Sequence, residues 1–366
     1  MRRYTTLMFM LTLCLLPVLS LSQSPASGAA PADVNQKSET EILLSFTGDC
    51  TLGSEDRLMN KPYAFHAYIE KEGYAYPFEK VQSVFANDDV TVINLENVFY
   101  DSMRNKIKKT YNFRGPTDFA RILKQGSIEL SFLGNNHTYD YSYQGFRSTV
   151  QAIEEQGLDW IVTTDDVIKT WIYEKDGIKI GFTGAYITYF NRKPEKVKQS
   201  FEELKAAGCD FIVSIMHGGE EYGPRQNRGI IRFAKFLADQ GAGLVVGHHP
   251  HVLHGMEIYN NATIIYSLGN FSFGGNAELR SFQTMIAQAT LRFDEHGDFV
   301  EHQVNLLPAH TSGTLEYNNY QPVLVHGLEA QAIIDLVSSM SEFTLEPYEE
   351  GVGAWQKSVS GVSSQP

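Results

Sequence analysis

The amino-acid sequence predicts an α/β fold that contains both parallel and antiparallel strands. Short apolar runs alternate with amphipathic stretches from about residue 41 to residue 343, and two further segments have the pattern of β-hairpins. Alternating strands and helices indicate an α/β architecture, to which hairpins add antiparallel strands. The 366-residue chain is 43% hydrophobic and 20% charged, so most of it is expected to fold.

The expected strands are short runs rich in Val, Ile and Leu, as in strands that are buried on both faces. They comprise residues 42–46, 90–95, 128–133, 210–216, 243–247 and 263–268. One hairpin is expected over 171–185, because Asp176-Gly177 favours a tight turn, and another over 284–308. A single doubly wound parallel sheet therefore does not explain the whole pattern.

The expected helices are amphipathic segments that separate these strands. They comprise residues 77–88, 116–126, 143–157, 198–208 and 225–241, and a last helix follows over 327–343. Four of the first five end at glycine, which commonly stops a helix. We expect one domain over residues 41–343 and a loose, Gly- and Ser-rich C-terminal tail over residues 344–366.

The N-terminus has the pattern of a secretory signal peptide over residues 1–22. Arg2 and Arg3 precede an apolar stretch, and small residues follow it. Residues 23–40 are small and polar and are expected to form a flexible linker. The protein is therefore expected to be exported and to lie outside the cell or at its surface. An uncleaved segment that anchors the protein in the membrane is the alternative, which Pro17 and the short apolar span disfavour.

The net charge indicates which partners are expected, and the cysteine content bears on disulfide formation. The net charge is −13 and there is no long basic run, so nucleic acid is not expected as a partner. An acidic chain is compatible with bound divalent cations. After removal of the signal peptide, Cys50 and Cys209 remain. They could pair in an oxidising compartment, but two unpaired thiols are the simpler interpretation.

The most informative pattern is that metal-binding side chains follow the expected strands. In open α/β folds, sites gather beyond the carboxyl ends of the strands. First-row divalent metals bind imidazole and carboxylate groups, and two-metal sites need a carboxylate between the ions. We therefore predict that these side chains meet in one cation-binding pocket. They are Asp49; Asn94 and Glu96; Asn135, Asn136, His137 and Asp140; His217, Glu220 and Glu221; His248, His249 and His251; and Asn270.

Several of these residues also have a simpler explanation. His249 and His251 could be ordinary turn residues, and His137 could cap a helix. Glu220 and Glu221 could be solvated turn charges. Asn94 and Asn270 are equally well explained as residues that satisfy loop backbone groups. His248 is interpreted as a residue that surrounds the site or lies on the surface, and not as a ligand.

Six short motifs, in order, resemble those of the poly-γ-glutamate capsule-biosynthesis proteins of the CapA type, which are relatives of the calcineurin-like metallophosphoesterases. They are Gly48-Asp49, "NLE" (94–96), "GNNHTYDY" (134–141), "HGGEEY" (217–222), "GHHPHV" (247–252) and "SLGNFSFG" (267–274). The resemblance covers about residues 42–343. It implies a metallophosphoesterase-like four-layer αββα sandwich with two mixed β-sheets.

The resemblance also implies roles for individual residues around two divalent ions, which would be Mn, Zn or Fe. Asp49 and His251 would bind the first ion, and Glu96 would lie between the ions. The second ion would be bound by Asn136, His217 and His249. His137 would be a proton donor or a transition-state stabiliser, with Asp140 as the residue that orients it. Asn94, Glu220, His248 and Asn270 would surround these ligands.

Two departures from the resemblance bear on activity. Thr51 stands where the phosphoesterases usually carry a histidine, and Ser54 stands where capsule-type relatives often carry an arginine. A cation for gripping phosphate would then have to come from elsewhere, such as Arg57, Arg114 or Arg225.

Two functions are compatible with this pattern. The first is metal-dependent hydrolysis or transfer on an anionic polymer or a phosphoester, in the biosynthesis of a poly-γ-glutamate capsule or another envelope polymer. The second is a non-catalytic factor that binds the polymer during assembly or export and has a structural metal site. Membrane-bound capsule synthesis machinery is the expected protein partner in both cases.

Overall fold

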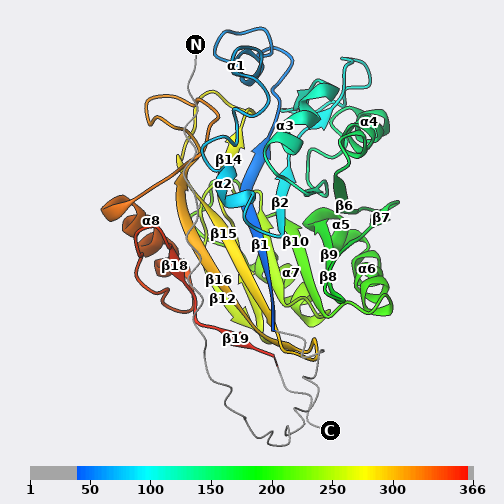
Figure 1. Ribbon diagram of the computed structural model, residues 1–366. Coiled ribbons are helices and arrows are strands. Elements are labelled where there is room, and N and C mark those ends of the chain that lie inside the picture. The colour runs from blue at the N-terminus through cyan, green and yellow to red at the C-terminus, as the bar shows by residue number, and fades with distance from the viewer. Residues whose placement is uncertain (1–38, 362–366) are drawn as a thin grey trace, which may run out of the picture. The chain divides into compact units, whose positions relative to one another are not determined.

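A computed structural model describes residues 39–361 (Figure 1). The expected signal peptide over 1–22 and nearly all of the expected linker over 23–40 lie outside the described residues. Among residues 39–361, no helix has the length and apolar character needed to cross a bilayer.

The strand β1 (Thr40–Thr51) is the centre of the first part of the sheet. On one side β1 pairs in parallel with β2 (Val90–Leu95), which pairs in parallel with β5 (Leu130–Phe132). On its other side β1 pairs first with β15 (Gln283–Phe293), antiparallel, and near its carboxyl end with β14 (Asn270–Phe273), parallel. β15 continues into β16 (Phe299–His310), which forms the expected second hairpin.

The second part of the sheet is built around three parallel strands. These are β9 (Ile178–Tyr186), β10 (Phe211–His217) and β11 (Leu244–His248). β8 (Trp171–Lys175) pairs with β9 in the expected first hairpin, and β11 pairs with β13 (Ala262–Ile265). The remaining strands are β3 (Val98–Phe99), β4 (Arg114–Gly115), β7 (Ile168–Lys169), β12 (Met256–Tyr259), β17 (Val323–Leu324), β18 (Ala354–Trp355) and β19 (Val359–Ser360).

The two parts are connected through β6 (Asp159–Thr163). Its first residues pair with β5, and Thr163 pairs with β9. All but β3 and β4 of the described strands are therefore linked by pairing into one 17-stranded network. The predicted α/β class with mixed strands is confirmed.

Helices connect the strands and bury one face each. α7 (Arg228–Asp239) shows why: Asn227 caps its first turn, and apolar residues recur at helical spacing on the buried side. The others are α1 (Phe65–Glu72), α2 (Gln82–Phe85), α3 (Ala120–Gln125), α4 (Ser142–Glu155), α5 (Ile187–Arg192), α6 (Pro194–Ala206) and α8 (Gly327–Met340), with a 3-10 turn at Thr117–Phe119.

The helix expected over 77–88 is much shorter in the structure. Only α2 is helical, and successive turns precede it. Phe78, Val81 and Phe85 are nevertheless buried, with exposures of 1% or less. Tight turns place these three side chains on one side, so the helical spacing of apolar residues is satisfied without a long helix.

Three apolar clusters surround the strand network. The first joins residues of β1, β2, β5 and β15 to residues of β9, β10 and β11. The second packs α1, α3 and α4 against the other side of β1 and β2, and the third packs α5, α6 and α7 against β10 and β11. The carboxyl ends of the parallel strands are therefore held by core packing on both sides.

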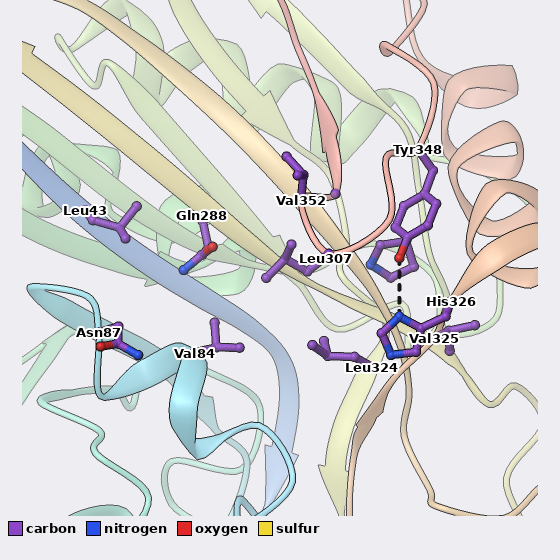
Figure 2. A pocket seen from close by; sticks show the side chains of 13 residues that line it. Leu43, Val84, Asn87, Gln288, Leu307, Leu324, Val325, His326, Tyr348 and Val352 are labelled. Carbon is purple, nitrogen blue, oxygen red and sulfur yellow. Dashed lines mark hydrogen bonds between the residues drawn. The ribbon is translucent and has the colours of Figure 1, made fainter.

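Part of the C-terminal segment is ordered against the body, where the sequence suggested a loose tail. β18 and β19 pair with β16. A cavity of about 290 Å³ lies between this segment and the strands. Figure 2 shows side chains that line it, among them Tyr348, whose Oη lies 3.5 Å from His326 Nδ1. None of the predicted site residues lines this cavity.

Candidate metal centre

Strand pairing brings the predicted site residues to one edge of the network. Asp49 lies opposite Asn94 of β2 and opposite Asn270, which begins β14. The backbone approaches closely here: a Cβ at Gly48 would lie 2.3 Å from the Gly269 carbonyl oxygen. Asp49 N donates to this same oxygen at 2.8 Å. Only glycine at position 48 lets β1 and the 267–270 segment meet at this distance.

Asp49 is fully buried and is contacted by three other side chains. Asn94 Nδ2 donates to its Oδ1 at 2.8 Å, and His248 Nδ1 lies 3.0 Å from the same oxygen. Its Oδ2 lies 3.2 Å from His251 Nδ1, which also lies 2.9 Å from Asn270 Oδ1. The carboxylate is thus fixed in direction by partners on both oxygens.

Glu96 follows β2 and is also fully buried. Its Oε1 lies 3.3 Å from His217 Nε2 and accepts from Asn94 Nδ2 at 3.2 Å. His217 ends β10, and its Nε2 lies 2.9 Å from Asn136 Oδ1. Asn135 orients Asn94, because Asn135 Nδ2 donates to Asn94 Oδ1 at 3.0 Å.

The turn after β11 presents two imidazoles from an unusual backbone. His249 has φ 99° and His251 has φ 58°, both in the left-handed region that favours glycine. The ring centroids of His249 and His217 are 4.7 Å apart, and those of His249 and His251 are 5.9 Å apart. The turn therefore places His249 between the histidines at 217 and 251.

These residues form three overlapping groups. Within each group, the possible ligand atoms all lie within 4.8 Å of one another. The groups are Glu96, His217 and His249; Asp49, Glu96 and His251; and Glu221, His249 and His251. Glu96 Oε2 and His249 Nδ1 are buried with no hydrogen-bond partner in the described part of the chain. Buried polar atoms are rarely left unpaired, so this donor set fits a divalent cation that would pair with them.

Glu221, and not Glu220, is the acidic residue of the "HGGEEY" motif that the structure brings to the centre. Both residues are exposed. Gly218 has φ 154° and Gly219 has φ 120°, and Tyr222 N donates to Pro250 O at 2.8 Å. This turn directs Glu221 toward the histidine turn, and the sequence alone offered no means to choose between adjacent glutamates.

Burial and mutual charge shift the pKa values of the carboxylates in opposite directions. Burial raises the pKa of Asp49, but the hydrogen bonds and charges of His248 and His251 outweigh it and hold the pKa well below its usual range. Burial and the charge of Asp49 raise the pKa of Glu96 well above its usual range. The two neighbouring carboxyl groups therefore do not ionise together in the absence of a cation.

The imidazoles of the centre are shifted in opposite directions too. Burial lowers the pKa of His217 well below its usual value and that of His249 to about 4. Burial also lowers the pKa of His251, but the charge of Glu96 and the hydrogen bond to Asp49 outweigh it and raise this pKa to about 9. His217 and His249 are therefore neutral near pH 7, which is the form that binds metals.

His137 and Asp140 form a second cluster beside the ligand groups. His137 Nδ1 lies 2.7 Å from Asp140 Oδ2, and the imidazole stacks on Phe113 with ring centroids 4.4 Å apart. Lys109 Nζ lies 2.6 Å from Asp140 Oδ1, 3.2 Å from His137 Nδ1 and 2.9 Å from Asn136 O. Lys109 could not be identified from the sequence, because it lies in a loop 28 residues before His137 and belongs to none of the six motifs.

The residues that depart from the resemblance have structural partners. Thr51 is fully buried, with its hydroxyl 3.5 Å from Glu96 O, and Ser54 Oγ donates to Gly274 O at 3.1 Å. Arg57 is paired with Glu55, and Arg114 with Asp56. Neither arginine replaces the missing cation in this conformation. Cys50 and Cys209 are both free thiols in the structure.

The fold and this centre define a mixed α/β protein with a cluster of carboxylate, amide and imidazole side chains able to hold divalent cations. The chain belongs to the bacterial capsule synthesis protein PGA_cap family, whose model matches residues 43–275. The matched segment contains every predicted site residue, from Asp49 to Asn270. The family inferred from the six motifs is thereby confirmed.

Individual relatives agree with the family assignment. The chain is 30% identical over 266 residues to the PGA biosynthesis protein CapA of Bacillus subtilis (strain 168), covering 68% of this chain and 67% of that protein. It is 26% identical over 266 residues to the capsule biosynthesis protein CapA of Bacillus anthracis, covering 67% of this chain. The match spans only 62% of the length of the B. anthracis protein.

One solved structure is similar at a low level. The crystal structure of the protein TT1561 of Thermus thermophilus has a TM-score of 0.41 and 11% identity, covering 75% of this chain and all of that one.

Proposed function

We propose that this protein is a metal-dependent hydrolase or transferase that acts in the biosynthesis of a poly-γ-glutamate capsule or a related envelope polymer. The proposal is supported chiefly by one observation: two of the ligand groups share Glu96, and both Glu96 Oε2 and His249 Nδ1 are buried without partners in the described part of the chain. The relatives' names, which refer to capsule and PGA biosynthesis, support the polymer.

The ligand groups suggest how two cations would be held. Asp49 and His251 would bind the first, His217 and His249 the second, and Glu96 both, with Asn136 contributing its side-chain oxygen to the second. Mn, Zn and Fe all accept such ligands. When bound, these ions would polarise a phosphoryl or acyl oxygen and increase the acidity of water.

The chain's own residues would position the ligands and donate a proton. Asn94 and His248 hold the Asp49 carboxylate from the side away from His251. His137 would donate a proton to the leaving group from Nε2, because Asp140 and Lys109 occupy the region around Nδ1. Asp140 Oδ2, at 2.7 Å, would accept a hydrogen bond from Nδ1 and stabilise the protonated imidazole, whose Nε2 hydrogen is the one to be donated.

The fold and the location are part of the same proposal. The three apolar clusters support four layers, in which the two parts of the strand network form the inner layers and helices cover each outer face. Arg2, Arg3 and the apolar stretch over 7–22 support export to the cell surface or beyond. Membrane-bound synthesis machinery would then meet the protein at the polymer's exit.

Removal of metal tests the catalytic function. The protein is dialysed against chelator and assayed on a panel of phosphate esters and γ-glutamyl peptides. Turnover should disappear and return with Mn²⁺ or Zn²⁺, and the double variant His249→Ala/His251→Ala should lose both metal content and turnover. A metal-loaded protein that is inactive across the whole panel contradicts this function.

A non-catalytic polymer-binding factor is the second candidate. Thr51 favours this function, because it stands where the phosphoesterases usually carry a histidine ligand of the first cation. Its buried hydroxyl contacts Glu96 O instead, so the first cation has one imidazole ligand fewer. This function predicts that polymer binding is saturable and survives His137→Ala, with no turnover to lose. A turnover that His137→Ala abolishes, while binding persists, decides for catalysis.

A further inference from the structure

An uncommitted arginine lies beside the open side of the metal centre. Arg280 is exposed, and its guanidinium carbon lies 4.4 Å from the centroid of the Tyr222 ring. The Tyr222 ring lies in turn 5.7 Å from the His251 ring. The three side chains therefore form a row that runs from the surface into the centre.

The charge of Arg280 is available to a ligand. Three other cations near the centre are each bound to a carboxylate: Arg57 to Glu55, Arg114 to Asp56 and Lys109 to Asp140. Arg225 is exposed and has no ion pair within the described residues, but it does not stack on an aromatic ring beside the centre as Arg280 does. Within residues 39–361, Arg280 has neither an ion pair nor a side-chain hydrogen bond. Its partner is the face of Tyr222, and no described side chain accepts a hydrogen bond from its N–H groups, which are therefore available to an anion.

The surroundings of Tyr222 connect this arginine to the cation cluster. Tyr222 adjoins Glu221, whose carboxylate forms a ligand group with His249 and His251. Tyr222 N donates to Pro250 O, so the same turn carries the aromatic ring and is attached to the histidine turn. A ligand oxyanion at the guanidinium would therefore lie at the entrance to the centre.

We propose that Arg280 and Tyr222 form an oxyanion-binding subsite that recognises a second anionic group of the substrate, next to the group that enters the metal centre. Arg280 is then a specificity-determining residue, and it supplies the cation that Ser54 does not. The ligand chemistry is a carboxylate or phosphate oxyanion, which a planar guanidinium binds with two parallel hydrogen bonds. The role of Arg280 in substrate specificity rests on the proposed function, whereas the binding of an oxyanion at Arg280 does not depend on it.

Anion titrations of the full chain test the subsite. Inorganic phosphate and γ-linked triglutamate are titrated by calorimetry into wild type, Arg280→Gln, Arg280→Lys and Arg147→Gln, each with and without Mn²⁺. Loss of a charge-assisted contact predicts roughly 10-fold weaker binding by Arg280→Gln. Arg280→Lys should retain part of the affinity, because it keeps the charge without the planar fork. Arg147 is exposed on α4 and has no ion pair in the described chain, so Arg147→Gln controls for loss of one positive charge and should bind as wild type.

The outcomes separate the subsite from the proposed function. A loss confined to triglutamate assigns a carboxylate polymer, and a loss confined to phosphate assigns a phosphoester. Equal affinities of wild type and Arg280→Gln for both probes overturn the subsite, as does a wild type that binds neither. Metal content is measured on the same samples, so a protein that binds anions through Arg280 but no metal contradicts only the proposed function.

Discussion

His248 Nδ1 lies 3.0 Å from Asp49 Oδ1, although 199 positions separate the two residues. This contact joins the carboxyl end of β1 to that of β11, which belong to different parts of the strand network. His248 fixes the direction of Asp49 without belonging to any of the three ligand groups. Residues that orient a metal ligand are often as important to affinity as the ligand itself.

We therefore predict that His248→Ala weakens metal binding while the protein stays folded. A loss of about 10- to 100-fold in affinity is typical when such an orienting residue is removed. Competition with a fluorescent chelator measures it. His296→Ala serves as the control, because His296 is exposed at the surface and should leave the affinity unchanged. Equal affinities of the two variants would contradict the orienting role.

Glu96→Gln should have opposite effects on the metal-free and metal-loaded protein. Glu96 is fully buried beside Asp49, and its pKa is raised, so its ionisation destabilises the metal-free fold as the pH rises. At pH 8 without metal, the variant should melt about 2–4 °C above wild type, as expected for a gain of ~1 kcal/mol. Saturating Mn²⁺ should raise the melting temperature of wild type and not of the variant. The exposed Glu220→Gln is the matched control, and a metal-induced shift in Glu96→Gln equal to that of wild type would sink the prediction.

Metal binding should release protons. In the metal-free protein the pKa of His251 is raised to about 9, so its imidazole carries an extra proton near pH 7, and the raised pKa of Glu96 favours the protonated carboxyl group. Each group must be deprotonated to act as a ligand. Calorimetry in buffers of different ionisation enthalpy should give at least ~1 proton released per protein at pH 7, decreasing toward pH 9. Release that does not depend on pH would show that these groups are already deprotonated.

Lys109→Met should lower the free energy of unfolding without unfolding the protein, and it should disturb the contact between His137 and Asp140. Asp140 is fully buried, and Lys109 is its cationic partner at 2.6 Å. Loss of one partner of a buried pair typically costs about 3–5 kcal/mol, and the partial exposure of Lys109 places the expected cost at the lower end. Urea denaturation measures this cost, and the ¹⁵N shifts of His137 report a change in the protonation of its imidazole. Lys108→Met, one position earlier in the loop, should change neither quantity.

Asp88→Asn should stabilise the protein at alkaline pH only. Burial raises the pKa of Asp88 to about 7, although Thr91 Oγ1 donates to its Oδ2 at 2.7 Å. A raised carboxyl pKa leaves stability intact below the unfolded value of about 3.9 and removes it as the pH rises toward 7. The variant should gain about 1–2 kcal/mol at pH 8, after allowance for solvent screening, and almost nothing at pH 4. Urea melts at the two pH values check the sign, and a gain at pH 4 would contradict it.

Much of the fold could be predicted because its determinants are local. The Val- and Ile-rich runs indicated β1, β2, β5, β10 and β11, and Asp176-Gly177 marked the β8–β9 hairpin. β6 was missed, although its pairing with β5 and β9 decides that the strands form one network. Its sequence, "DWIVT", carries no local signal for two partners, because the partners are chosen by packing in three dimensions.

Some residues of the candidate centre could likewise be identified from the sequence, and others could not. Motif order was enough to name Asp49, Glu96, His217 and His249, since each ends or follows a strand whose carboxyl end lies at one edge. Lys109, Glu221 and Arg280 needed the structure. Two lie in loops outside the motifs, and Glu221 differs from its neighbour only in the direction that the Gly218-Gly219 turn gives it.

The positive φ angles at His249 and His251 give a criterion for interpreting other members of this family. Glycine or asparagine would occupy these backbone conformations with less strain, so drift without selection should lead toward those residues. A homologue that keeps imidazoles there retains them for what they bind. In a homologue with glycine at both positions, the turn is less strained but has no imidazole ligands. We expect such a homologue to keep the fold and to have lost the cation.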